Sequence, residues 1–245
     1  MFYAIHRDLF MRKKKLVILS GAGVSAESGI ATFRDSNGLW EGHDVMSVAS
    51  PEGWAKNKEL VLDFYNQRRK QAASVLPNAA HVCIAELEQY FDVTVITQNV
   101  DNLHEKAGST TIIHLHGELF KSQSTVDKKL VYEMKKLEIV IGDTCEKGSQ
   151  LRPYIVWFGE SVPLIKDAAA ICEKADYLIV VGTSLVVYPA AGLLDYVPLT
   201  IPKFVIDPKK PDVTFYKNMT FIEEKATTGM VKVKELLLKE IGQSL

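Results

Sequence analysis

Two histidines stand on either side of Leu115, at positions His114 and His116, directly before Gly117. Side chains at alternate positions of an extended segment point to opposite faces, so we expect only one of the two rings to face a ligand. Imidazole has a pKa near neutrality and can take a proton from a hydroxyl group. As an isolated pattern, however, His-x-His is equally typical of a packed or metal-linked pair.

A polar segment containing Gln98, Asn99 and Asp101 follows directly on an apolar, β-branched run at 93–96. In open α/β folds, ligands bind at the carboxyl ends of the parallel strands, which is where this segment would lie. Its amide groups and its carboxylate are suited to holding a carboxamide. On its own, the sequence Asn-Val-Asp also fits a simple turn.

The segment from Gly21 to Ala26 has the pattern G-x-G-x-x-A and follows a short apolar run at 16–19. Glycines in a strand–turn–helix unit let the backbone approach a pyrophosphate, although a plain tight connection explains the pattern about equally well. A ribose-binding acid should end a second strand about 20 residues further on. The sequence at 36–41 is instead a loop with no strand before it. The turn therefore indicates a dinucleotide site that differs from that of an ordinary dehydrogenase.

Tyr65 and Arg68 are separated by three positions in a stretch with a helical pattern, so their side chains share one helix face. A guanidinium fork beside a hydroxyl group is a good receptor for a carboxylate. A solvated helix face is the other interpretation, and from these residues alone it is favoured about three to one.

Four apolar runs supply the strands that would position these groups. Each ends in polar or turn-forming residues, and they lie at 16–19, 93–96, 177–181 and 203–206. Helical patterns alternate with them, at 51–74, 79–90, 162–174 and 230–241. This alternation predicts an α/β fold with a Rossmann-like doubly wound parallel sheet.

Two stretches fit this alternation poorly, one long and helical and the other charged and irregular. We expect them to form a smaller inserted lobe, from about 31–75 and 119–152. The large lobe would then consist of about 13–30, 76–118 and 153–245. A chain of 245 residues fits one such domain with insertions. Met11 is a second candidate for the translation start, because the basic residues that follow it are directly before the first predicted strand.

Composition restricts the class of partner. The 29 basic and 30 acidic residues nearly cancel, so we expect no nucleic acid and no anionic membrane as a partner. Apolar runs are too short for a membrane span and no signal-peptide core is recognisable, which favours a cytoplasmic protein. The three cysteines form no CxxC pair, a pattern that fits reduced thiols.

Five motifs, in order, resemble those of the sirtuin family. They are GAGVSAESGIATFRDSNGLW from position 21, TQNVDNLHEKAG from 97, HLHGEL from 114, VWFGE from 156 and GTSLVVYPAA from 182. The resemblance extends over about 13–240. It implies NAD-consuming protein-lysine deacylation, with NAD and a peptide meeting in the cleft between a Rossmann-like lobe and a small lobe.

The resemblance also implies a role for each matching residue. His116 would be the catalytic base, Asn99 and Asp101 would hold the nicotinamide end of NAD, and Gln98 would contact its ribose. The acyl-lysine oxygen would attack the nicotinamide ribose carbon as nicotinamide leaves, which gives an alkylimidate. His116 would then activate the ribose hydroxyls to attack the imidate carbon, and water would release lysine and acyl-ADP-ribose. The other positions assigned to NAD are Gly21, Ala22, Gly23, Ala26, Phe33, Arg34, Gly182, Thr183, Ser184, Asp207 and Ala226.

Acyl-lysine proteins or peptides would bind beside two edge segments that can sandwich an extended chain by strand addition. By the same resemblance, Phe158 would wall the acyl-lysine tunnel. Tyr65 and Arg68 match the Tyr-x-x-Arg of sirtuins that remove succinyl and malonyl groups, which now favours a carboxylate receptor over a solvated helix face. We therefore expect desuccinylase and demalonylase activity with some deacetylase activity. The remaining substrate positions are Val156, Gly159 and Val186.

The chain departs from the family pattern at two places. Most sirtuins have four zinc-binding cysteines between the catalytic histidine and the VWFGE segment, but this interval holds only Cys145. We expect no structural zinc. Asp207 stands where the family usually has an asparagine beside the adenosine ribose, and its charge favours NAD over NADP. Serine or threonine lies about where the first cysteine pair would be, at Ser122, Ser124 and Thr125, and the lobe would be held by Leu130, Tyr132, Met134, Leu137, Ile139 and Ile141.

The residues leave two other functions open. One is a protein that binds NAD or ADP-ribose without turnover, and the other is a protein mono-ADP-ribosyltransferase. The combination of His116 with Asn99 and Asp101 favours turnover. His81 and His104 also match family positions, and we interpret them as structural. We further expect a monomer.

Overall fold

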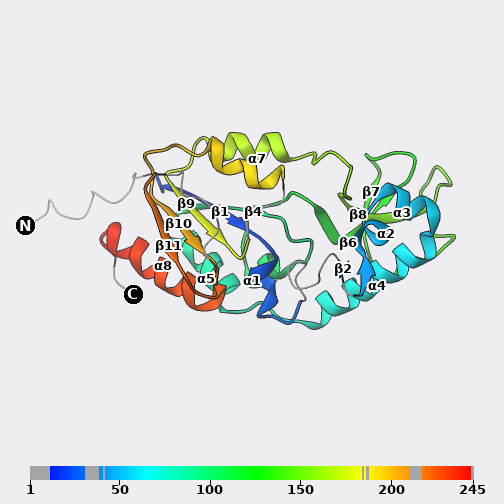
Figure 1. The fold of residues 1–245 in the computed structure, drawn as a ribbon, viewed down its shortest axis with the longest axis horizontal. Coiled ribbons are helices and arrows are strands. Elements are labelled where there is room, and N and C mark those ends of the chain that lie inside the picture. Colours follow the sequence, from blue (N-terminus) through cyan, green and yellow to red (C-terminus); the bar gives the residue numbers. More distant parts are fainter. Residues whose placement is uncertain are drawn as a thin grey trace, which may run out of the picture.

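A six-stranded parallel sheet is the largest structural unit of the protein (Figure 1). The computed structural model describes residues 12–30, 39–40, 42–183, 185, 188–209 and 217–243. Across the sheet the order is β11-β10-β9-β1-β4-β5, and each neighbouring pair is parallel. The strands are β1 Lys15–Ser20, β4 Asp92–Thr97, β5 Ile112–His114, β9 Tyr177–Val181, β10 Lys203–Ile206 and β11 Met219–Ile222.

The central strands form from aliphatic runs that are buried on both faces of the sheet. Every residue of β9 and β10 is buried, as is typical of parallel strands covered by helices. The four strands predicted from the sequence are confirmed. β5 and β11 were not predicted, because β5 has only three residues and β11 is an edge strand that is only partly buried.

Helices cover both faces of the sheet (Figure 1). One face packs on α5 (Ala79–Glu86) and α8 (Ala226–Glu240), and the other packs on α7 (Ile165–Cys172) and the 3-10 helix η3 (Ala190–Tyr196). This is the doubly wound α/β arrangement that the sequence predicted. A short 3-10 helix, η2 (Leu87–Gln89), extends α5. Within the described residues, no helix is long and apolar enough to cross a membrane.

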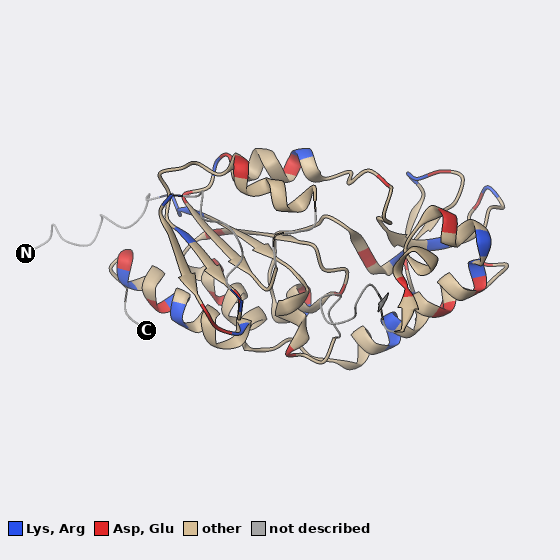
Figure 2. Ribbon diagram, in the orientation of Figure 1, with Lys and Arg blue, Asp and Glu red and all other residues tan. Residues whose placement is uncertain are grey.

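A second group of elements, here called the small unit, is built around an antiparallel sheet of order β7-β6-β8. In Figure 1 its strands and helices lie together, away from the large sheet. Figure 2 shows basic and acidic residues interspersed on its helices and on α8. Its elements are β6 Gly117–Ser124, β7 Val131–Glu133, β8 Leu151–Ile155, α2 Val45–Val48, α3 Pro51–Lys56 and α4 Lys58–Ser74, next to the two-residue strands β2 (Leu39–Trp40) and β3 (His43–Asp44).

Two sequence expectations for the small unit were wrong. The helix expected over 51–74 is two helices, because Asn57 has an extended backbone and its side chain accepts a hydrogen bond from the amide of Leu60, which starts α4. Leu137 and Ile141 were expected to pack inside but are 40% and 52% exposed. Ile139 is buried, and Met134 packs against the same apolar cluster.

A buried arginine adds hydrogen bonds to the apolar packing of the small unit. Arg69, on α4, is fully buried and donates to the carbonyl oxygens of Leu119 at 2.5 Å and Leu137 at 2.9 Å. Asn66, one turn earlier, bonds both the amide and the carbonyl of Ile139, at 2.9 and 3.0 Å. Burial lowers the pKa of Arg69 to about 10, so the guanidinium stays charged at neutral pH. These contacts tie α4 to β6 and to the irregular segment 137–139.

Replacing Arg69 by methionine is expected to lower the free energy of unfolding by about 3 kcal/mol, because buried carbonyl groups lose their donors. Chemical denaturation of the two proteins measures the difference. The exposed neighbour Lys70, changed to methionine, should alter stability by less than about 0.5 kcal/mol. Addition of EDTA should not change the midpoint of the wild-type unfolding transition. A wild-type-like Arg69→Met protein, or a large loss with EDTA, would contradict this account of the small unit.

Candidate functional site

The carboxyl ends of four neighbouring strands bring the sequence-predicted polar residues to one edge of the large sheet. Gly21 follows β1, Gln98 follows β4, Gly182 follows β9 and Asp207 follows β10. Adjacent parallel strands end side by side, so these loops meet, although their positions in the sequence are far apart. Phe33, Arg34, Ser184 and Val186 lie outside the described residues, as does Met11.

The glycine turn after β1 packs directly against the end of β9. The amide of Gly23 donates to the carbonyl of Gly182 at 2.8 Å, and that of Gly21 donates to Val181 at 3.1 Å. A Cβ atom on Gly23 would lie 2.7 Å from Cα of Gly182. Gly182 has φ +65°, and a Cβ there would collide with the backbone amide of Val24. The glycines are therefore required by the contact between the two loops.

Two alanines predicted to belong to this turn, Ala22 and Ala26, lie exposed at the two ends of α1 (Ala22–Ala26).

A buried hydrogen-bond network joins this turn to the segment after β4. The carboxamide of Asn99 donates to the carbonyl of Gly21 and to the hydroxyl of Ser25, both at 3.1 Å. Ser25 in turn donates to Asp101 at 2.9 Å, and the amide of Leu103 donates to the same carboxylate at 3.1 Å. Asn99 and Asp101 are 6% and 5% exposed. Burial raises the pKa of the Asp101 carboxyl, against the lowering effect of its two hydrogen bonds.

Ser25 was missed as a site residue by sequence reasoning. Its hydroxyl bonds both Asn99 and Asp101, and Ser25 is 1% exposed. The available signal was a polar residue inside the glycine motif, on the short helix α1 that the turn begins.

His116 is held with one ring nitrogen engaged. Its Nδ1 lies 3.1 Å from the carbonyl of Gln98, which can only accept, so Nδ1 carries the proton and Nε2 keeps its lone pair. Burial lowers the pKa of His116, so the ring stays neutral to a lower pH than an ordinary imidazole does. Gly117 follows with φ +86°, and a side chain there would collide with the carbonyl of Tyr154 on β8. The carbonyl of His116 accepts from Val156 at 2.9 Å.

The other histidines occupy different environments. His114 bonds Asn99 through Nδ1 at 2.9 Å and Glu105 through Nε2 at 2.7 Å. His81 and His104 are buried with their ring centroids 4.9 Å apart, and burial lowers their pKa values to about 4 and about 3. A hydrogen bond of 2.9 Å joins His104 to Ser20 at the end of β1.

The outer part of the edge is formed by Thr183, Asp207 and the start of α8. Thr183 accepts from the Gln98 side chain at 3.1 Å, which links the ends of β4 and β9. Asp207 is buried and accepts from the amide of Lys209 at 2.9 Å. Ala226 is the first, buried residue of α8. The Glu27 carboxylate, just after α1, accepts from the amide and hydroxyl of Thr227, both at 3.0 Å.

One of the predicted substrate residues, Tyr65, contacts Trp157, next to Phe158 and Gly159. The hydroxyl of Tyr65, fully buried on α4, accepts a hydrogen bond from the indole nitrogen of Trp157 at 3.1 Å. The next residue, Phe158, is 43% exposed, and Gly159 after it has φ +88°. Arg68 is half-buried, with its guanidinium 5.6 Å from the ring centroid of Phe64. Tyr65 and Arg68 thus differ in burial, although they share one helix.

Cys145 lies in a small polar cluster of the small unit. Its sulfur is 3.4 Å from the hydroxyl of Ser124 and 3.2 Å from that of Ser149, and these two hydroxyls are 2.9 Å apart. Hydrogen bonds among one thiol and two hydroxyls thus join β6 to the loop before β8. Ser122, also suggested by the sequence, is buried within β6, and Thr125 bonds the carbonyl of Gln150 at 2.8 Å.

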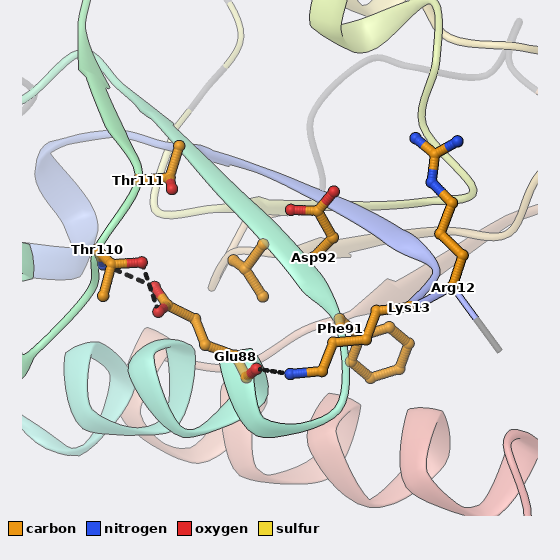
Figure 3. A pocket seen from close by; sticks show the side chains of 8 residues that line it. Arg12, Lys13, Glu88, Phe91, Asp92, Thr110 and Thr111 are labelled. Carbon is orange, nitrogen blue, oxygen red and sulfur yellow. Dashed lines mark hydrogen bonds between the residues drawn. The ribbon is translucent and has the colours of Figure 1, made fainter. Parts of the chain in front are cut away.

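A surface pocket of about 340 Å³ lies at the opposite edge of the sheet, where β1 and β4 begin (Figure 3). Lys13 reaches across it to the carbonyl of Glu88 at 2.8 Å, and the Glu88 carboxylate accepts from the amide and hydroxyl of Thr110. Its lining contains none of the residues that the sequence predicted for the site.

Comparison with known proteins places these features in a family. The Sir2 family model matches residues 21–189. An NAD-dependent protein deacylase of Helicobacter pylori is 54% identical over 226 residues, covering 92% of this chain and 98% of that protein. One of Bacteroides thetaiotaomicron is 52% identical over 230 residues, with the same coverage. A solved Sir2 homologue in complex with NAD has a TM-score of 0.84 at 39% identity, covering 94% of this chain and 91% of that one. The chain therefore belongs to the Sir2 family, the sirtuins, and is an enzyme of the NAD-dependent protein deacylase class.

Proposed function

We propose that this protein removes succinyl, malonyl and acetyl groups from lysine side chains, and that it consumes NAD to give nicotinamide and O-acyl-ADP-ribose. The observation that carries the proposal is the convergence of His116, Asn99 and Asp101 on the carboxyl edge of the sheet. Their buried network with Ser25 gives that edge a fixed set of donors and acceptors, and His116 next to it has a free lone pair.

The edge fits NAD in its polar groups. Both N–H groups of the Asn99 carboxamide are engaged within the network, so its oxygen and the Asp101 carboxylate would act as acceptors for the amide group of nicotinamide. Gln98, Thr183 and Asp207 would take the ribose hydroxyls and adenosine end, next to the glycine turn. Bound NAD would supply the ADP-ribosyl group that receives the acyl chain. The chain's own residues would hold that group at the carboxyl edge of the sheet.

His116 would act as the base of the reaction. Its proton sits on Nδ1, fixed by the carbonyl of Gln98, so Nε2 can accept the proton of a ribose hydroxyl. The backbone of the same residue accepts from Val156. This contact ties the base to the segment 156–159, where we place the acyl-lysine beside Val156, Phe158 and Gly159.

Tyr65 and Arg68 would recognise an acidic acyl tail. The Tyr65 hydroxyl accepts from Trp157 and is fully buried, so it would donate its own proton to a carboxylate only where the acyl tail reaches this interior position. Arg68 would add a charge-assisted hydrogen bond. Both lie on α4, and we propose that the small unit forms a small lobe, about 31–75 and 119–152, against a large lobe of about 13–30, 76–118 and 153–245.

The variant Arg68→Met is expected to lower kcat/KM on a succinyl-lysine peptide by about ten- to hundredfold, because a charge-assisted hydrogen bond contributes about 1.5–3 kcal/mol. Activity on the matched acetyl-lysine peptide should change by less than about threefold. Lys70→Met, two positions along α4, is the matched control and should change neither rate. Equal losses on both peptides would refute the acyl preference.

The same assay separates the proposed reaction from its alternatives. With label in the ADP-ribose part of NAD, deacylation places the label on acyl-ADP-ribose. A protein mono-ADP-ribosyltransferase would place it on protein, and a binding protein would leave it on NAD.

A further inference from the structure

His114 faces a hydrogen-bond acceptor at each ring nitrogen. Nδ1 lies 2.9 Å from the carbonyl of Asn99, and Nε2 lies 2.7 Å from a carboxylate oxygen of Glu105 on α6 (Leu103–Ala107). A neutral imidazole carries one proton, so its other nitrogen would present a lone pair to one of these oxygens. The imidazolium, in contrast, donates to both. The geometry therefore favours the charged form of a side chain that is 9% exposed.

The two carboxylates near His114, those of Glu105 and Glu118, also favour the charged form of its ring. Glu118, on β6, has a carboxylate within 4.8 Å of the His114–Glu105 pair, and Lys121 binds it at 3.0 Å. In turn, the charge of His114 lowers the pKa values of Asp101, in the loop before α6, and of His104, on α6. Burial lowers the pKa of His114, but the hydrogen bond and charge of Glu105 outweigh it, so the pKa lies above 6.5. Burial also raises the pKa of Glu105, and the bond to His114 reverses this.

His114 holds the peptide on which the candidate NAD-binding groups depend. The carbonyl groups of residues 98–100 each accept one hydrogen bond, from Nδ1 of His116, from Nδ1 of His114 and from the amide of Leu119. Of these three donors, only His114 is bonded to a carboxylate on its other side. It therefore joins Glu105 of α6 to the backbone carbonyl of Asn99, in the middle of the segment 98–100.

We propose that His114 is a positioning residue that works as an imidazolium, paired with Glu105, to hold Asn99 and Asp101 in place for NAD. The inference rests on the proposed assignment of these two residues to NAD. Loss of the ring proton leaves an acceptor facing an acceptor, so one contact opens and the segment loosens. NAD affinity then falls as pH rises through the pKa of His114. Because His116 must be neutral, the two histidines limit the active pH range from opposite sides.

Two variants of one carboxylate cluster test this. Glu105→Gln removes the charge that His114 faces but keeps an acceptor, and Glu118→Gln removes a nearby carboxylate that is bonded to Lys121 instead. The His114 ring pKa is measured by NMR on the protein alone, and KM for NAD and kcat are measured with an acetyl-lysine peptide from about pH 5.5 to about pH 9. For Glu105→Gln we expect a lower ring pKa. At a pH above the ring pKa of both proteins, KM for NAD should be higher in Glu105→Gln, by at most about tenfold for each unit by which that pKa falls, with kcat little changed.

Each outcome has a definite meaning. A ring pKa that is unchanged in Glu105→Gln, or that falls equally in both variants, overturns the charged pair. A lowered ring pKa with an unaltered pH dependence of KM overturns the positioning role. The NMR measurement needs neither NAD nor turnover, so it stands even if the assignment of Asn99 and Asp101 to NAD fails. That assignment is tested separately by substitution of Asn99.

Discussion

Replacing His116 by glutamine is expected to lower kcat for deacylation by about 10²–10⁴-fold, the usual contribution of a positioned general base. The wild-type ring offers the lone pair of Nε2 because Nδ1 is committed to the carbonyl of Gln98. A glutamine amide can occupy the space and donate to the same carbonyl, but it cannot accept a proton near neutral pH. The loss should therefore appear in kcat, with little change in the affinity for NAD.

The pH profile gives an independent check on His116. Burial lowers its pKa below 6.5, so the base remains neutral and active on descending to that pH and is lost only below it. In the wild type, the acidic limb of kcat should lie below pH 6.5, and His116→Gln should abolish that limb. Thermal unfolding of the variant shows whether the fold is intact. A variant with near wild-type kcat would remove His116 from the mechanism.

The change Asn99→Asp is expected to reduce kcat/KM for NAD by about 10²–10³-fold, which corresponds to about 3–4 kcal/mol. The wild-type amide donates to the carbonyl of Gly21 and to Ser25. A carboxylate there would face the Gly21 carbonyl as a second acceptor, and it would place a like charge near Asp101 in a buried site. Both the network and the proposed contact with nicotinamide would be lost.

Asn102→Asp is the matched control, since it makes the same amide-to-carboxylate change three positions along the chain. Asn102 is the N-cap of α6 and its side chain makes no capping hydrogen bond, so this change adds a charge beside Asp101 without breaking the hydrogen bonds of Asn99. Steady-state kinetics with varied NAD should show a large loss for the first variant and less than about a threefold change for the second. Similar losses in both would point to a general effect of charge rather than a specific role of Asn99.

Much of the fold could be predicted, because it is encoded in local runs of aliphatic residues. β1, β4, β9 and β10 are largely buried, and each contains a short run of mostly apolar residues. β5 was missed because three residues carry no periodicity. The small unit was poorly predicted, since its stability depends on a buried cation, Arg69, whose partners are backbone carbonyl groups at positions 119 and 137. Every residue has a backbone carbonyl group, so the sequence does not show which of these groups a buried arginine will contact.

The candidate site was predictable in its members and unpredictable in its connections. His116 and Asn99 stand in short motifs, so their residue types and order are visible. The link through Ser25, which joins Asn99 to Asp101, depends on a side chain turned inward from α1. The opposite behaviour of His114 and His116 was also hidden, because it follows from which oxygen each second nitrogen faces.

The contact between Glu27 and Thr227, which are 200 residues apart, has a consequence for biosynthesis. β1 leaves the ribosome early but lies at the centre of the sheet, between β4 and the much later β9. Its apolar faces must wait for partners, and the glycine turn cannot be completed before Gly182 emerges. Nonlocal pairing of this kind is slow and leaves nascent chains prone to association. The candidate site is therefore among the last parts of the nascent chain to be completed, because its loops meet only after β9, β10 and α8 have been made.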